Sequence, residues 1–184
     1  MSIRTRSITT ADHLLAASGE LGPCELVRGE LIMMVPAGFV HGRIEGRIHS
    51  AIDKFASSKD LGVVTPGDTG FLLERFPDTV RSPDVAFVCK QRIPSVPPQG
   101  YFPGPPDLAV EIRSPDDRPN AVAEKIADYL RLGVQVVWDV NPETRSITVH
   151  RSGSELTVFA RDDTVTEPAL LPGFALAVEE VFAW

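Results

Sequence analysis

Apolar residues recur with helical spacing early in the chain. From Phe39 onward they fall every three or four positions, at Val40, Ile44, Ile48, Ile52 and Phe55. This spacing places them on one face and predicts an amphipathic helix of roughly 20 residues. A shorter helix is predicted around Leu14, opened by a threonine cap at residues 9–10 and ended by Gly19. Between these helices, two β-prone runs in residues 25–35 flank Arg28-Gly29 and predict a hairpin.

The pattern then changes to short strands with turn signals between them. Strands are predicted at residues 61–65, 70–76, 84–90, 107–113, 135–140, 146–150 and 155–160. A helix from about Pro119 to Leu132 separates the fourth and fifth strands, which predicts a parallel pair with a crossover helix. The expected fold class is α/β, a mixed β-sheet flanked by helices, with a β-hairpin and a β-meander. One domain over residues 1–184 accounts for it.

Residues 91–106 contain six prolines. Such a stretch cannot be a helix or a central strand, so an ordered surface loop that adds no strand is expected. Because it joins two strands that each carry a carboxylate, we expect it to form a rim near a cleft or a contact to a second subunit. Tyr101 and Phe102 would be its apolar anchors.

Composition describes an ordinary globular protein, with 43% hydrophobic and 23% charged residues in 184 positions. No run approaches the roughly 18 apolar residues of a membrane span, and no secretory signal is visible, so a cytoplasmic protein without a membrane partner is expected. Two distant cysteines argue against a disulfide scaffold or a zinc site. The sequence also lacks the motifs of nucleotide-triphosphate hydrolysis, dinucleotide binding, zinc proteolysis and α/β-hydrolase chemistry.

The formal net charge of −7 bears on function. A protein that holds nucleic acid mainly through its electrostatic field is expected to be basic, so tight passive binding to nucleic acid is disfavoured. An acidic metal site that acts on nucleic acid remains compatible with this charge, because a bound cation reverses the local sign.

Two carboxylates in otherwise apolar strands are the candidate metal-binding residues. Asp84 follows a proline at a strand start, and Glu111 lies inside the run Leu-Ala-Val-Glu-Ile. Buried carboxylates are rare unless they are paired or bound to metal, and two of them on adjacent strands suit Mg²⁺ or Mn²⁺. Lys125, one or two turns into the following helix, can bring a positive charge to a water or a phosphate.

Six blocks of sequence, in order, resemble the Uma-two family of the PD-(D/E)XK nuclease superfamily. They are E-L-V-R-G-E-L, H-G-R-I, S-P-D-V-A-F-V, P-D-L-A-V-E-I-R-S-P, E-K-I-A-D-Y-L-R-L-G-V and V-W-D-V-N-P-E. The resemblance as a whole covers the chain from about Thr9 to Phe182. The resemblance implies a restriction-endonuclease-like core and a Mg²⁺-dependent (or Mn²⁺-dependent) endonuclease that hydrolyses DNA phosphodiester bonds. A symmetric homodimer would suit cleavage of both strands.

The resemblance also implies roles for single residues. Asp84 and Glu111 match the metal-binding positions, while Arg113 stands where the superfamily pattern has lysine. Arginine stays protonated and is a poor base, and Lys125 matches a lysine that has moved to the next helix. Two further residues, Glu25 and His41, match accessory positions of the same cleft.

Two other functions stay open on the sequence. One is a non-catalytic binding or assembly module that retains the nuclease fold, which fits the low basicity of the chain and the presence of Arg113. The other is an enzyme that acts on small phosphoesters, which would need no basic groove. Single residues also have plainer interpretations, since Asp84 can be a turn cap and Lys125 a solvated charge.

The nuclease hypothesis makes two geometric predictions. The carboxylates of Asp84 and Glu111 should lie close enough to share one divalent ion. The Lys125 ammonium should reach their cleft, whereas Arg113 should serve substrate phosphate or an ion pair.

Overall fold

A computed structural model describes residues 8–96 and 98–183 of the chain. The helices are α1 (Ala11–Ala17), α2 (Phe39–Lys59), the 3-10 turn η1 (Lys90–Arg92), α3 (Pro119–Arg131) and α4 (Val178–Phe182). The strands are β1 (Cys24–Val27), β2 (Glu30–Met33), β3 (Gly62–Pro66), β4 (Phe71–Glu74), β5 (Thr79–Arg81), β6 (Val85–Cys89), β7 (Phe102–Pro103), β8 (Leu108–Ile112), β9 (Val136–Asn141), β10 (Ser146–Arg151), β11 (Thr157–Phe159), β12 (Thr164–Glu167) and β13 (Leu171–Ala177). Within these described ranges, no helix has both the length and the apolar content needed to cross a membrane.

The central sheet has six strands in the order β11-β10-β9-β8-β6-β3. Strands β8 and β9 run parallel and are joined by α3, whereas the other pairs of this sheet are antiparallel. The predicted crossover is therefore confirmed. Proline at the first turn of α3 and Gly133 just after its end, with a φ of 99°, fix the helix at both ends.

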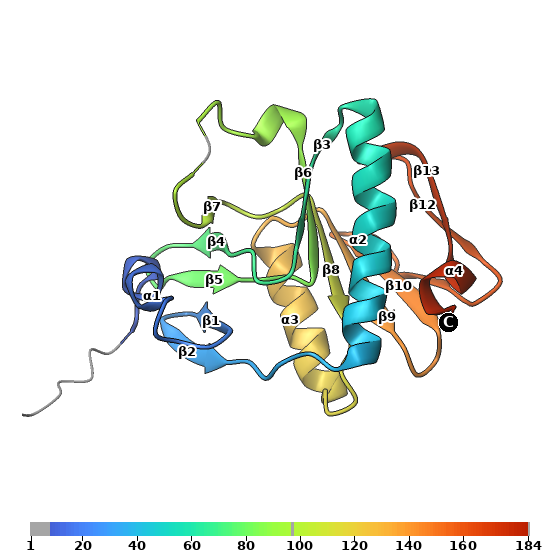
Figure 1. Cartoon of the computed structure of the whole chain (residues 1–184). Coiled ribbons are helices and arrows are strands. Elements are labelled where there is room, and N and C mark those ends of the chain that lie inside the picture. Colours follow the sequence, from blue (N-terminus) through green and yellow to red (C-terminus); the bar gives the residue numbers. More distant parts are fainter. Residues whose placement is uncertain (1–7, 97, 184) are drawn as a thin grey trace, which may run out of the picture.

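The two faces of this sheet carry different helices (Figure 1). On one face, Ile44, Ile48, Ile52 and Ala56 of α2 pack against alternate residues of β8 and β9, such as Val110 and Trp138. On the other face, α3 packs against Ala109 and Val137, the residues between them. Since strand residues alternate between faces, Glu111 points towards α3.

A second sheet of five strands, in the order β2-β1-β5-β4-β7, lies beside the first. The predicted hairpin is present, and its two turn residues, Arg28 and Gly29, have φ angles of 51° and 80°. Positive φ at both positions is the geometry of a two-residue hairpin turn. The α/β class is thus confirmed, but the strands divide among several sheets rather than forming one.

The proline-rich loop differs from the expectation in one respect. It does add a strand, because β7 pairs in parallel with β4 at the edge of the second sheet. Two residues suffice there, since an edge strand needs hydrogen bonds on one side only. Tyr101 and Phe102 are anchors, as predicted: Tyr101 packs near α1, and the Phe102 ring lies 5.5 Å from that of Phe71.

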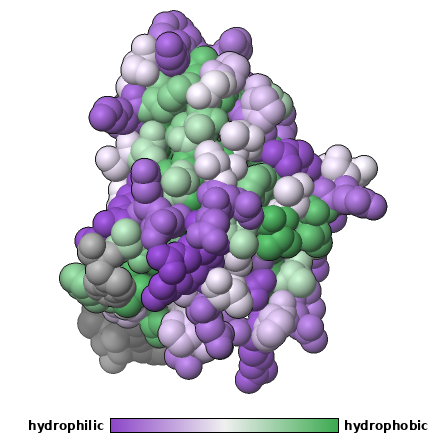
Figure 2. Space-filling view, turned by 90° about the vertical axis from the view of Figure 1, so that its right-hand side faces the viewer, coloured by the Kyte–Doolittle hydropathy of each residue, from purple (hydrophilic) through white to green (hydrophobic). Residues whose placement is uncertain are grey.

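The C-terminal part forms an antiparallel ribbon, β12–β13, followed by α4. Its buried side, including Leu171 and Phe174, extends the core against α2. Figure 2 shows the outer surface of the molecule on the side where β12, β13 and α4 lie. A strip of hydrophobic residues runs through its upper half, bordered by hydrophilic ones.

Candidate active site

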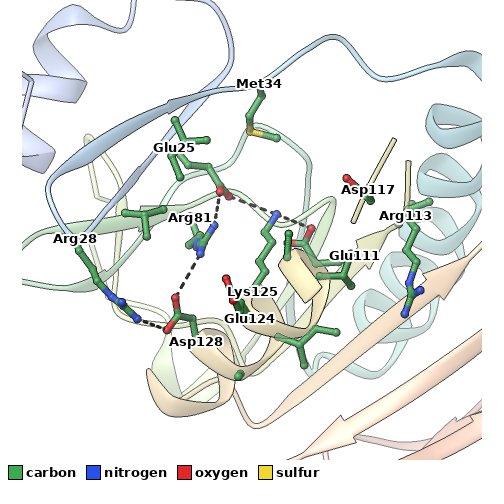
Figure 3. A pocket seen from close by; sticks show the side chains of 17 residues that line it. Glu25, Arg28, Met34, Arg81, Glu111, Arg113, Asp117, Glu124, Lys125 and Asp128 are labelled. Atoms are coloured by element: carbon green, nitrogen blue, oxygen red, sulfur yellow. Dashed lines mark hydrogen bonds and ion pairs between the residues drawn. The ribbon is translucent and has the colours of Figure 1, made fainter. Parts of the chain in front are cut away.

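A cleft of about 760 Å³ lies between the β1–β2 hairpin and α3 (Figure 3). Its walls come from the hairpin, the ends of β5 and β8, and the exposed side of α3. We call it the α3 cleft. Its charged lining residues are Glu25, Arg28, Arg81, Glu111, Arg113, Asp117, Glu124, Lys125 and Asp128.

Glu111 is held by two side chains of α3. The Lys125 ammonium Nζ lies 2.7 Å from Oε2, and the Tyr129 hydroxyl donates a hydrogen bond of 2.6 Å to Oε1. Lys125 and Tyr129 are four residues apart, so they project from the same side of the helix. Only 13% of the Glu111 side chain is exposed. The predicted position of Lys125 in the cleft is therefore what the geometry shows.

Burial and charge together shift the titration of these groups. Burial, assisted by the nearby carboxylates of Asp84 and Glu25, raises the pKa of Glu111 to about 7 against the opposing effect of Lys125. Burial favours a lower pKa for Lys125, but the carboxylates of Glu111 and Glu25 outweigh it and raise the pKa. The ammonium therefore stays charged at neutral pH.

Glu25 lies on the opposite wall of the α3 cleft and is 3% exposed. It accepts hydrogen bonds from Arg81 at 2.8 Å and from the backbone N–H of Ser82 at 2.9 Å, and its Oε1 lies 3.7 Å from Lys125 Nζ. Arg81 also approaches Asp128 at 3.6 Å. This chain of ion pairs, drawn as dashed lines in Figure 3, ties the hairpin and β5 to α3 around the lysine.

Asp84 lies just before β6, beside the end of β8. The register Val85↔Val110 brings it next to Glu111, and its Oδ2 accepts the backbone N–H of Ile112 at 2.7 Å. The same oxygen lies 3.3 Å from Nε2 of His41, in the first turn of α2. The hydrogen bond to Asp84 is the main cause that raises the pKa of His41, while burial opposes it.

His41, Glu45 and Asp84 form a group that we call the α2 cluster. One ligand atom from each lies within 4.8 Å of the others, which is the spacing of a metal site. Glu45 accepts the N–H of Gly67 at 3.1 Å through Oε1, which leaves its second oxygen for another partner. Among the described residues, the buried Nδ1 of His41 has no hydrogen-bond partner.

The predicted site residues thus divide between two neighbouring places. Glu25, Glu111, Arg113 and Lys125 line the α3 cleft, whereas His41 and Asp84 belong to the α2 cluster. The described residues of the proline-rich loop do not line the cleft, so they form no part of its wall. The other expected role of this loop, a contact to a second subunit, stays a prediction.

Arg113 has another partner. Its guanidinium makes two hydrogen bonds to Asp139, of 2.7 and 2.6 Å, and Figure 3 shows it directed away from Glu111 and Lys125. Asp139 stands opposite Glu111 in the β8–β9 register. The ion pair was one of the two roles predicted for Arg113.

Three residues of the site escaped the sequence analysis: Glu45, Arg81 and Tyr129. Glu45 follows His41 by four positions and Tyr129 follows Lys125 by four, so helical spacing could have placed each beside its partner. Arg81 carried no such signal, because it meets Glu25 only through the β1–β5 pairing.

Comparisons with known proteins bear on the family and on the fold. A family model described as "Uma2: Putative restriction endonuclease" matches residues 11–179. No curated protein matches the sequence. The crystal structure of "a putative nuclease belonging to DUF820" from Anabaena variabilis superposes with a TM-score of 0.75 and 23% identity, covering 91% of this chain and 96% of that one. At this identity the structural likeness establishes the fold alone.

Proposed function

The chain belongs to the Uma2 family, and from this premise we propose that it is a metal-dependent endonuclease that hydrolyses DNA phosphodiester bonds. The observation that carries the proposal is the Lys125 ammonium, 2.7 Å from Glu111, at a strand end beside Asp84. A cation next to two carboxylates on adjacent strands is the arrangement needed to hold a metal and a phosphate together.

The residues fit a divalent ion. Asp84 would hold it together with His41 and Glu45, which lie within 4.8 Å of it and of one another, and Glu111, next to Asp84 across the β6–β8 pair, would complete the donor set. Oxygen donors suit Mg²⁺ and Mn²⁺, and the imidazole favours Mn²⁺ more than Mg²⁺. Among the described residues, the buried Nδ1 of His41 has no hydrogen-bond partner, so it can interact with a group that binds here. When bound, such an ion lowers the pKa of a water and neutralises charge on phosphate.

Lys125 is the proposed catalytic cation. Its raised pKa keeps it protonated, so it acts by orienting the attacking water and by stabilising the extra negative charge of the pentacoordinate phosphate. Arg113 is not required for this role, since Asp139 already holds its guanidinium. Glu25, which Arg81 holds by a hydrogen bond of 2.8 Å, attracts the Lys125 ammonium and helps to keep it in the cleft.

DNA is the proposed substrate despite the acidic chain. The α3 cleft gathers four cations, Arg28, Arg81, Arg113 and Lys125, beside five carboxylates. The positive charge that attracts the phosphate would therefore come mainly from the bound metal. We further propose that two copies of the chain act together, because cleavage of both strands needs two such sites.

Incubation with DNA tests the proposal. Supercoiled, linear and single-stranded DNA would be incubated with Mg²⁺, Mn²⁺ or EDTA. We expect metal-dependent cleavage that Asp84→Asn reduces at least about 100-fold, a loss typical of essential catalytic groups. Asp12→Asn is the matched control, since the Asp12 side chain is 81% exposed and makes a loose ion pair with Arg75 at 3.6 Å.

Other outcomes would change the assignment. Metal binding without cleavage of any nucleic acid would contradict the endonuclease and support a binding module. Hydrolysis of bis(p-nitrophenyl) phosphate without cleavage of DNA would instead indicate an enzyme of small phosphoesters.

A further inference from the structure

Among the described residues, Tyr129 is the neutral side chain that hydrogen-bonds to Glu111, and it lies fully within the core. Its side chain is 0% exposed and packs with Ala109, Ile126 and Val137. The hydroxyl nevertheless leaves this apolar group to donate to Glu111 Oε1 at 2.6 Å. A buried hydroxyl requires a hydrogen-bond partner. Here the partner is Glu111, a proposed metal ligand, which indicates a functional role for Tyr129.

The two oxygens of Glu111 have partners of different kinds. Oε1 is held by a phenol whose ring is fixed in the core, whereas Oε2 is held by the flexible side chain of Lys125. Lys125 has a second carboxylate within reach, because Glu25 Oε1 lies 3.7 Å from its ammonium. Lys125 can therefore release Oε2 and keep an anionic partner, while Tyr129 cannot move without disturbing the core.

We propose that Tyr129 is a positioning residue: its hydroxyl fixes Oε1 of Glu111, so that Oε2 is the oxygen presented to the metal. This inference rests on the proposed function, in which Glu111 is a metal ligand. Groups that orient a ligand in this way typically change metal affinity or activity by about 10- to 100-fold when removed.

The tyrosine ring also lies between two cations. Lys125 Nζ and the guanidinium carbon of Arg81 are each 6.0 Å from its centroid. Phenylalanine keeps this ring, its packing and both cation–π contacts, and removes only the hydroxyl. Tyr129→Phe therefore isolates the hydrogen bond to Glu111.

The first test compares the two tyrosines of the chain. Direct titration with Mn²⁺ by calorimetry should show affinity about 10- to 100-fold weaker in Tyr129→Phe. Tyr101→Phe is the control, since Tyr101 belongs to a separate cluster near α1, and it should bind as the wild type does. Cleavage by Tyr129→Phe should recover at high Mn²⁺ concentration, which a merely damaged core would not permit. Equal affinity in Tyr129→Phe and wild type would overturn the proposal.

A second measurement does not need the Tyr129→Phe variant. With 3-fluorotyrosine incorporated, the chain gives two ¹⁹F resonances, assigned by means of Tyr101→Phe. Addition of Mg²⁺ should shift the Tyr129 resonance and leave that of Tyr101 in place. If Mg²⁺ binds and the Tyr129 resonance does not move, this inference is wrong while the proposed function stands. If neither Mg²⁺ nor Mn²⁺ binds at all, the metal-dependent function fails, and the role of Tyr129 fails with it.

Discussion

At the scale of single residues, the position of Glu111 in an apolar strand made it possible to expect a functional role for it from the sequence. A carboxylate inside the run Leu108–Ile112 has to be satisfied in the folded state, and the pairing with Lys125 does this. The predicted approach of Lys125 to Glu111 is found, whereas the metal-binding role of Glu111 and the catalytic role of Lys125 stay predictions. Tyr129 and Arg81 were not predicted as site residues, because the sequence alone does not indicate which carboxylate a tyrosine or an arginine contacts. That one ion bridges Asp84 and Glu111 stays a prediction.

Replacement of Lys125 tests the catalytic cation. Lys125→Met should lower the cleavage rate at least about 100-fold, because the charge that stabilises the transition state is lost. Metal binding should remain, since the substitution frees an oxygen of Glu111. The control is Lys59→Met, an exposed lysine at the end of α2. A wild-type cleavage rate in Lys125→Met would transfer the role to Arg113.

The Arg113–Asp139 pair predicts a dependence of stability on pH. Burial favours a higher pKa for Asp139, but the hydrogen bonds from Arg113, assisted by His150, outweigh it, so the pKa lies below the ordinary 3.8. A lowered folded-state pKa means that the pair stabilises the fold above pH 3.8 and loses this effect as the pH falls through the lowered pKa. Arg113→Met should therefore reduce the free energy of unfolding by about 1–3 kcal/mol at pH 7.

Urea unfolding at pH 7 and pH 3 measures this effect. The difference between Arg113→Met and wild type should shrink at the lower pH. Arg131→Met provides the comparison, because Arg131 makes looser ion pairs of 3.4 and 3.5 Å at the surface, and it should change little at either pH. A loss of stability in Arg113→Met that is the same at both pH values would show that its packing, and not its charge, matters.

At the scale of elements, long periodic segments were predictable and short pairings were not. Helix α2 and the β8–α3–β9 unit follow from apolar spacing and from the proline and glycine at the ends of α3. Strands β5 and β7 have three and two residues. Segments this short do not show a detectable alternation of apolar and polar residues. The β12–β13 ribbon was missed for another reason: Pro172 and Gly173 interrupt its pattern, and its strands are defined by burial against α2.

Two glycines make opposite predictions about element stability. A Cβ on Gly62 in β3 would lie 2.1 Å from the carbonyl oxygen of Val88, so Gly62→Ala should destabilise the fold by about 1–3 kcal/mol. A Cβ on Gly46, on the exposed side of α2, would meet nothing within 4 Å. Gly46→Ala should therefore stabilise by about 0.5–1 kcal/mol, because glycine is unfavourable within a helix.

Thermal unfolding of both variants is the measurement. We expect a lower midpoint for Gly62→Ala and a higher one for Gly46→Ala. A neutral Gly62→Ala would mean that β3 can move away from β6, which contradicts the tight pairing described above.

At the scale of the whole molecule, the distribution of charge decides how DNA could be bound. A chain with a net charge of −7 repels the phosphate backbone, and the cations of the α3 cleft are already paired with carboxylates. The α2 cluster adds two carboxylates at the neighbouring position. Without a metal, the site therefore offers a phosphate little net attraction.

This balance predicts that metal and DNA bind cooperatively. Fluorescence anisotropy with a labelled oligonucleotide should show weak binding in EDTA and at least about 10-fold tighter binding with Ca²⁺, a hard cation that carboxylates accept. Asp84→Asn should abolish the gain, whereas Asp12→Asn should retain it. Tight binding of the wild type in EDTA would contradict the prediction, because DNA would then be held by surfaces outside the site. Such a result would favour a binding module, whose affinity should fall steeply with salt.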